Sequence, residues 1–101
     1  MLSSIPDHPF IIKYYETLLY HNLIMIAMEL IEGEDLFDSL SAKLPLKLEE
    51  IIFFAAQLVL MMEFLHENHI VYRDLKPENV MLNLDGYLTL IDFGTTKKLT
   101  I

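Results

Sequence analysis

The strongest constraint on the fold is a polar octapeptide at residues 72–79, followed by two short apolar runs and the triplet Asp-Phe-Gly at 92–94. The apolar runs, 80–84 and 87–91, flank Asp85-Gly86, a dipeptide typical of a tight β-hairpin turn. Because a hairpin returns the chain to the edge from which it started, we expect the end of the octapeptide and the start of the triplet to lie side by side.

Four side chains of this segment suit phosphoryl transfer, a reaction that needs an aligned hydroxyl and neutralised phosphate charge. Asp74 can accept the proton of a hydroxyl nucleophile, and Lys76 can reach the phosphate that is transferred. Asn79 and Asp92 offer an amide oxygen and a carboxylate, which are ligands that suit Mg²⁺. Asp74 alone would be typical of a solvated loop carboxylate. Its occurrence with the other three residues favours the catalytic interpretation.

The composition indicates a core-rich segment of a larger unit. The chain has 101 residues, enough for one small domain, of which 53% are hydrophobic and three are glycine. This composition is unlike that of a linker or a disordered tail. So many apolar residues in a short chain predict surfaces that other segments cover, and therefore exposed apolar patches on the chain by itself.

The chain is acidic, with a formal net charge of −8. This balance argues against nonspecific nucleic-acid binding, which needs a basic surface. Glu32, Glu34, Asp35 and Asp38 cluster near one expected helix start. They could attract a basic peptide substrate, or they could form a solvated face that complements the helix dipole. Without cysteine, disulfides and thiolate metal sites are excluded.

No membrane or secretory segment is expected. Residues 51–62 are apolar except for Gln57, but this run is too short to span a bilayer, and Glu63 closes it. The N-terminus lacks a basic region followed by a long apolar run, so a secretory signal is not indicated. We therefore expect a cytoplasmic, intracellular protein, which would suit chemistry that uses ATP.

The periodicity predicts an α+β fold. His21-Asn22 should form a turn between two strands, the second of them buried, and Gly33 should break the apolar run that follows. The long helix should be buried on most sides. The expected elements are strands at 10–20, 23–31 and 70–72, helices at 35–40 and 47–68, a loop at 41–46, and the hairpin at 80–91.

Residues 72–79 and 92–94 together resemble the catalytic loop and the metal-binding loop of a eukaryotic protein kinase. The likeness extends over nearly the whole chain, from His8-Pro9-Phe10-Ile11 onward. Tyr72 in place of the commoner histidine, together with Lys97-Lys98, resembles the AGC group, and within it the cGMP- and cAMP-dependent kinases. Lys76 favours a serine/threonine kinase over a tyrosine kinase.

The resemblance implies a partial protein-kinase-like fold and a set of further site residues. Residues 1–31 would be N-lobe strands and hinge, and residues 32–101 the start of the C-lobe, within a single kinase domain. ATP and Mg²⁺ would be the cofactors. By position, Met28 resembles the gatekeeper, Glu29 to Ile31 resemble the hinge that binds adenine, and Met81 resembles the residue under the adenine. Asp35 would contact ribose and a basic substrate residue, and Glu78 would contact a substrate arginine. A stacked apolar column would be formed by Leu2, Tyr14, Tyr72 and Phe93.

The resemblance covers only the central part of a kinase domain. The glycine-rich loop, the third-strand lysine, the helix C glutamate and the Ala-Pro-Glu motif have no counterpart in the 101 residues. We therefore expect the chain by itself to be inactive, and its parent to phosphorylate serine or threonine of protein substrates. The alternative is a noncatalytic kinase-like protein that binds a full kinase or a substrate as a decoy. A regulatory domain in a longer parent is implied by family likeness alone.

Overall fold

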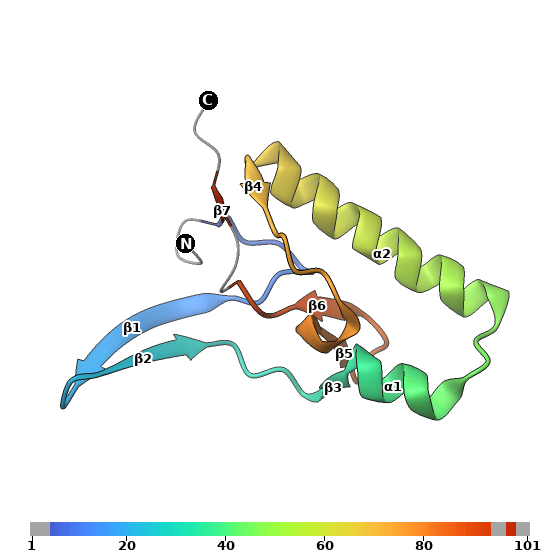
Figure 1. The fold of residues 1–101 in the computed structure, drawn as a ribbon, viewed down its shortest axis with the longest axis horizontal. Coiled ribbons are helices and arrows are strands. Elements are labelled where there is room, and N and C mark those ends of the chain that lie inside the picture. The colour runs from blue at the N-terminus through green and yellow to red at the C-terminus, as the bar shows by residue number, and fades with distance from the viewer. Residues whose placement is uncertain (1–4, 94–96, 99–101) are drawn as a thin grey trace.

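The computed structural model describes residues 5–93 and 97–98 and measures 46 × 36 × 20 Å. A two-stranded arm extends from a body in which a small sheet packs with two helices (Figure 1). The α+β class predicted from the sequence is confirmed. In chain order the elements are β1 (Tyr14–Tyr20), β2 (Leu23–Met28), β3 (Gly33–Asp35), α1 (Leu36–Lys43), α2 (Leu48–Glu67), β4 (Ile70–Val71), the 3₁₀ helix η2 (Pro77–Asn79), β5 (Val80–Asn83), β6 (Leu88–Leu90) and β7 (Lys97–Lys98).

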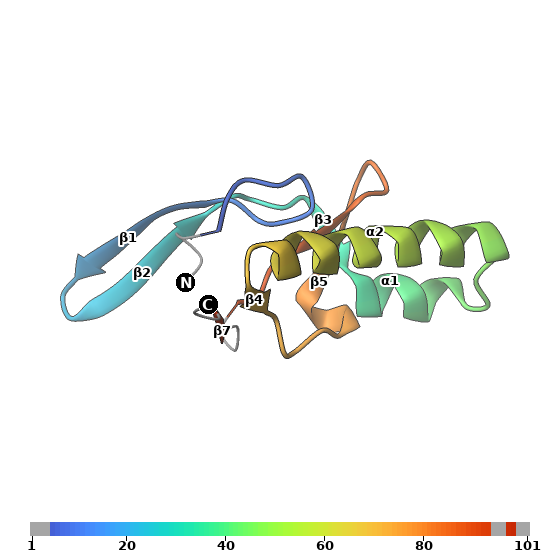
Figure 2. The same cartoon turned by 90° about the horizontal axis from the view of Figure 1, so that it is seen from above.

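The arm is the antiparallel hairpin of β1 and β2. His21 and Asn22 have positive φ angles of 47° and 64°, as the primed turns of two-residue hairpins require, so the predicted turn is confirmed. The arm projects clear of the helices in both views (Figures 1 and 2). Almost every side chain of β2 is exposed, so the prediction of a buried second strand is wrong. The apolar side chains of β2 therefore form a surface that no other segment of the described part of the chain covers.

The segment before β1 is not the regular strand that was predicted from residue 10. Instead it runs beside β6, where the Leu90 N–H donates to the Phe10 carbonyl at 2.8 Å and the Ile12 N–H donates to the Leu90 carbonyl at 3.1 Å. Ile11 and Ile12 are buried there. This bridge ties the base of the arm to the sheet of the body.

The sheet of the body has the order β3-β5-β6, with all strands antiparallel. Gly33 interrupts the apolar run as expected, and it opens β3 opposite Asn83. Its φ is 150°, and a Cβ at this position would lie 2.0 Å from the Leu82 carbonyl oxygen. Only glycine therefore permits this close approach of the two strands.

The predicted hairpin of β5 and β6 is confirmed, with one residue more in its loop than expected. The Asn83 N–H donates to the Tyr87 carbonyl at 2.9 Å, which leaves the three residues 84–86 as the loop. Gly86 takes a φ of 90°, and its N–H donates to the Asn83 carbonyl at 3.0 Å. This is the pattern of a turn followed by a left-handed residue.

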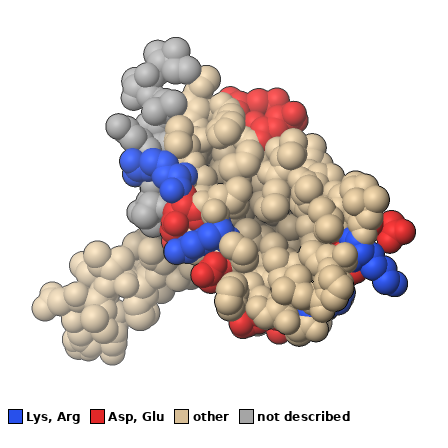
Figure 3. Space-filling model, turned by 45° about the vertical axis from the view of Figure 1, so that its right-hand side comes forward, with Lys and Arg blue, Asp and Glu red and all other residues tan. Residues whose placement is uncertain are grey.

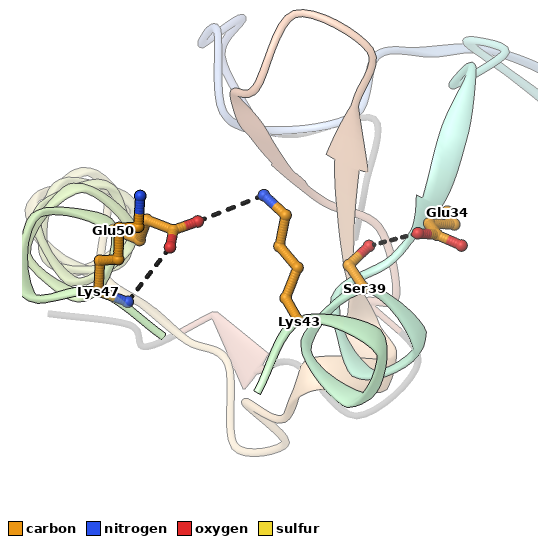
Figure 4. A network of polar contacts seen from close by, with 5 residues as sticks. All are labelled: Glu34, Ser39, Lys43, Lys47 and Glu50. Carbon is orange, nitrogen blue, oxygen red and sulfur yellow. Dashed lines mark hydrogen bonds and ion pairs between the residues drawn. The ribbon is translucent and has the colours of Figure 1, made fainter. Parts of the chain in front are cut away.

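Both helices begin at polar side chains. Asp35 precedes α1, and its Oδ1 accepts the Asp38 N–H at 2.8 Å. Glu50 in the first turn of α2 accepts the Lys47 N–H at 3.2 Å and lies 3.3 Å from the Lys43 Nζ at the end of α1 (Figure 4). These two interactions hold the pKa of Glu50 below its usual value. Helix α1 is longer than predicted, and α2 matches its predicted bounds to within one residue.

The core lies where α2 meets β4 and β6. Its fully buried side chains are apolar: Met61, Leu65, Ile70, Val80, Leu88 and Leu90. The rest of α2 is largely exposed, so the prediction that this helix is buried on most sides is wrong for the described residues. The expected exposed apolar patches are confirmed, on the arm and on α2. No helix among the described residues combines the length and apolar character that crossing a membrane requires.

Candidate active site

Asn79 is the buried centre of the predicted catalytic loop. It ends η2, is only 6% exposed, and its Nδ2 donates to the Asp74 carbonyl at 2.9 Å and to Asp74 Oδ2 at 3.1 Å. Both bonds fix the orientation of the amide. Its amide hydrogens are thus engaged by Asp74, and the role of its amide oxygen as a metal ligand stays a prediction.

Asp74 and Lys76 lie together at the surface of this loop. The Lys76 Nζ is 3.6 Å from Asp74 Oδ2, and both side chains remain accessible to solvent, at 49% and 38%. The pairing is loose, so either group can turn to a substrate. Arg73, just before Asp74, takes a φ of 73°, a left-handed conformation that non-glycine residues adopt mainly at turns and functional sites.

The β5–β6 hairpin brings Asp92 back to the catalytic loop. The Ile91 N–H donates to the Asn79 carbonyl at 3.1 Å, so Asp92 follows directly after a residue bonded to Asn79. Asp92 is exposed. The expectation that the two predicted metal ligands meet at one edge is therefore confirmed for the backbone. Gly94, the last residue of the predicted triplet, lies outside the described residues.

Tyr72 connects the catalytic loop with the segment that carries Asp92, through a buried contact with Phe93. It is 2% exposed, and its ring packs edge-to-face on Phe93 with centroids 5.4 Å apart. Burial raises the pKa of its hydroxyl to about 12, and the carboxylates of Asp92 and Asp74 add to this rise. The backbone of Asp92 and the side chain of Asn79 act in the opposite direction and lower the pKa of Tyr72. Among the described residues, however, none meets the Tyr72 hydroxyl in hydrogen-bond geometry.

The contact of Tyr72 with Phe93 agrees with the apolar column that the family likeness implies. Leu2 of that column lies outside the described residues. The sequence interpretation missed the buried hydroxyl of Tyr72 and the two hydrogen bonds that Asn79 donates to Asp74. The available signals were a tyrosine among the site residues and an amide five positions from a carboxylate.

The residues predicted to bind the nucleotide come from two strands and the segment between them. Asp35 and Met81 are direct partners in the β3–β5 pairing. Met28 ends β2, and the half-buried Ile31 packs against the core. The Glu29 N–H donates to the Lys13 carbonyl at 2.9 Å, so this backbone donor of the expected hinge is already engaged.

Glu78 is exposed in the first turn of η2, on the same loop as Asp74. Within the described residues no three histidine, aspartate or glutamate side chains converge as a metal site. Mg²⁺ is commonly bound by one or two protein ligands, with phosphate and water completing its shell. The pair Asn79 and Asp92 fits that mode of binding.

These features define the class of the protein. The catalytic loop, the returning hairpin and the α+β arrangement are those of a protein kinase, and the protein kinase domain family matches residues 1–101. The chain belongs to this family. Its similarity to AGC kinases, expected from Tyr72, is confirmed by named relatives.

The chain is 43% identical over 93 residues to the cGMP-dependent protein kinase of Toxoplasma gondii. The matched region covers 92% of this chain and 9% of that protein. It is 38% identical over 98 residues to the cAMP-dependent protein kinase catalytic subunit of Dictyostelium discoideum, covering 97% and 15%. It is 37% identical over 92 residues to the human ribosomal protein S6 kinase alpha-3, covering 91% and 12%. The chain thus spans a small part of the length of these relatives.

Proposed function

We propose that this chain is the central segment of a domain that transfers phosphate from ATP to serine or threonine of a protein substrate. The observation that carries the proposal is the Asn79 amide, fixed by Asp74 beside the strand that leads to Asp92. This arrangement supports a site in which a carboxylate for the nucleophile would lie next to two oxygen ligands for a metal. Residues 1–31 would belong to the N-lobe and hinge, and residues 32–101 to the C-lobe.

Each polar side chain has a part in this proposal. Asp74 orients the substrate hydroxyl and accepts its proton, and Lys76 neutralises charge on the transferred phosphate. Asn79 and Asp92 would hold Mg²⁺, which supplies charge neutralisation to the ATP phosphates when bound. The backbone carbonyl of Glu29 would accept from the adenine.

The site also suggests the kind of substrate. Glu78 lies exposed beside the catalytic loop, and Asp35 and Glu34 lie exposed or half-buried near β5. Such a charge distribution favours a basic peptide around the phosphorylated residue. In this proposal the protein acts inside the cell, binds no nucleic acid, and is regulated by another domain of a longer parent protein.

The complete domain encoded around this chain provides the test. We expect Asp74→Ala to lower the rate of peptide phosphorylation by about 10²-fold or more, the loss typical of a catalytic acid or base. Glu67→Ala at an exposed position of α2 serves as the matched control and should leave the rate unchanged. Equal rates for the Asp74→Ala and unmodified domains would contradict the proposal.

The 101-residue chain by itself should show no turnover, because electrostatic stabilisation of the transition state depends on a complete, water-poor site. Phosphotransfer by the purified chain that disappears on Asp74→Ala would contradict this expectation. A noncatalytic binding protein is the second candidate function, and the exposed apolar side chains of the arm favour it. Stop codons on both sides of the chain in a well-expressed transcript would support that alternative.

A further inference from the structure

The tip of the β5–β6 hairpin carries a chemically reactive pair of residues, Asp85 and Gly86. An aspartate can close a five-membered imide ring when its side-chain carbon Cγ bonds to the backbone nitrogen of the next residue. A glycine in that next position favours the closure, because it has no Cβ to crowd the nitrogen. Asp85 is the only aspartate of the sequence that precedes a glycine, and no asparagine does.

The space around Gly86 is open. Acidic side chains reach the surface at several places on the visible face of the body (Figure 3), so exposure by itself does not single out Asp85. A Cβ built on Gly86, however, would meet nothing within 4 Å beyond its chain neighbours. Asp85 is itself exposed, in a loop that projects from the body (Figure 2). Ring closure and attack by water therefore meet no steric obstacle on this side.

The loop also holds the two reacting groups close together. Asp85 Oδ1 accepts the Tyr87 N–H at 3.0 Å, so the carboxyl group is folded back over the backbone that follows it. The Gly86 nitrogen lies within the ring of atoms that this hydrogen bond closes. The carboxyl carbon is thereby kept near the nitrogen to which it must bond.

One hydrogen bond of Gly86 opposes ring closure. Its N–H donates to the Asn83 carbonyl at 3.0 Å, and an imide nitrogen has no hydrogen left to donate. At an exposed loop such a bond breaks by local opening, without unfolding of the whole domain. Asp38 is also exposed, but it precedes Ser39 within α1, where helical hydrogen bonds hold the backbone. The fold should therefore slow ring closure at Asp38 far more than at Asp85.

We propose that Asp85 isomerises spontaneously to isoaspartate in the folded chain, which makes the tip of this hairpin a site of covalent modification. First, the Gly86 nitrogen bonds to Cγ of the protonated carboxyl, whose hydroxyl group leaves as water with the hydrogen of that nitrogen. Water then adds to the main-chain carbonyl carbon of Asp85, and the bond from this carbon to the Gly86 nitrogen breaks. The chain now continues through Cβ and Cγ, and the former main-chain carbonyl is a free carboxylate. Addition of the water at Cγ instead regenerates aspartate.

The product changes the loop that sets the register of the hairpin. Isoaspartate adds one carbon atom to the main chain between Asn83 and Tyr87, which close the loop through the Asn83 N–H and the Tyr87 carbonyl. The bond from the Tyr87 N–H to Oδ1 is lost in its present geometry, because Cγ becomes part of the backbone. The same hairpin places Ile91, whose N–H donates to the Asn79 carbonyl, beside the catalytic loop. Isomerisation should therefore weaken the pairing of β5 with β6.

Incubation of the purified chain for several weeks at neutral pH, in buffer and in urea, tests the proposal. Electron-transfer fragmentation of its peptides distinguishes isoaspartate from aspartate at each position. We expect isoaspartate at Asp85 to form in buffer at a rate within several-fold of its rate in urea, and at Asp38 to form in urea alone. Asp85→Glu keeps the charge but would need a six-membered ring, so this variant should show no isomerisation in the loop.

A folded chain without isoaspartate at Asp85 would overturn the proposal, whether or not the chain in urea forms it. Equal formation at Asp38 in buffer would also overturn it, because the reaction would then pass through the unfolded chain. Hydrogen exchange measures the effect on the hairpin. The Gly86 and Tyr87 N–H groups should exchange faster in the isomerised molecules than in Asp85→Glu incubated alongside. Equal exchange in both would contradict the expected change of the loop.

Discussion

The hydroxyl of Tyr72 is buried, and no described group meets it in hydrogen-bond geometry. An unpaired buried polar group costs about 1–3 kcal/mol, so its removal should not destabilise the fold. We expect Tyr72→Phe to leave the free energy of unfolding unchanged or to raise it by up to about that amount. Urea unfolding followed by circular dichroism measures the difference, with the exposed Tyr87→Phe as the control near zero. A clear loss of stability would mean that the hydroxyl is hydrogen-bonded in solution.

Gln57, unlike the Tyr72 hydroxyl, has a hydrogen-bond partner for its buried side-chain oxygen. It is the buried polar residue of an apolar helix, and its Oε1 accepts the Leu88 N–H of β6 at 2.8 Å. Gln57→Met keeps the length of the side chain but leaves this buried N–H without its acceptor. We expect a loss of about 1–3 kcal/mol in the free energy of unfolding. Glu67→Met at an exposed position of the same helix should change it little, and a similar loss for both would refute the explanation.

At the scale of elements, the start of α1 depends on one carboxylate. Asp35 Oδ1 accepts the Asp38 N–H, whereas the carboxylate of Asp38 is exposed and raised in pKa chiefly by the charge of Asp35. Asp35→Ala should therefore cost about 1 kcal/mol of stability, the usual value of such a cap. Asp38→Ala removes only a repelled charge and should not destabilise. Thermal unfolding of both variants decides this, and equal losses would contradict the distinction.

His8 links the segment before the arm to α2. Its Nδ1 accepts the Phe10 N–H at 3.1 Å, and its ring lies 4.3 Å from the Phe64 ring on α2. Burial lowers the pKa of His8 below its usual value of 6.5. Protonation therefore favours the unfolded chain. The stability that depends on neutral His8 is complete above about pH 6.5 and is lost as the pH falls through the lowered pKa.

The expected result is a fall in unfolding temperature between neutral and mildly acidic pH, beyond that caused by the carboxylates. His8→Asn provides an amide oxygen near the position of Nδ1 but does not titrate, so its profile should be flatter over this range. The exposed His66→Asn should keep the profile of the unmodified chain. Identical profiles for His8→Asn and the unmodified chain would show that another group causes the fall.

The elements differ in how far the sequence could predict them. Helix α2 was predicted to within one residue, because polar residues mark both of its ends. Strand β3 was not, since Gly33 and two acidic residues have no strand propensity, and only pairing with β5 places them in a sheet. The meeting of Asn79 and Asp92 followed from the hairpin. The hydrogen bonds of Asn79 to Asp74 required coordinates, because a loop conformation with Arg73 at positive φ cannot be read from residue types.

For the molecule as a whole, composition predicted a surplus of apolar surface but not its place. A share of 53% hydrophobic residues exceeds what so small a core can bury. Apolar runs in β2 and α2 look the same in sequence whether they are covered or open. Tertiary arrangement decides between these cases. Here it leaves the uncharged β2 exposed in the arm, whereas most acidic residues lie on the body.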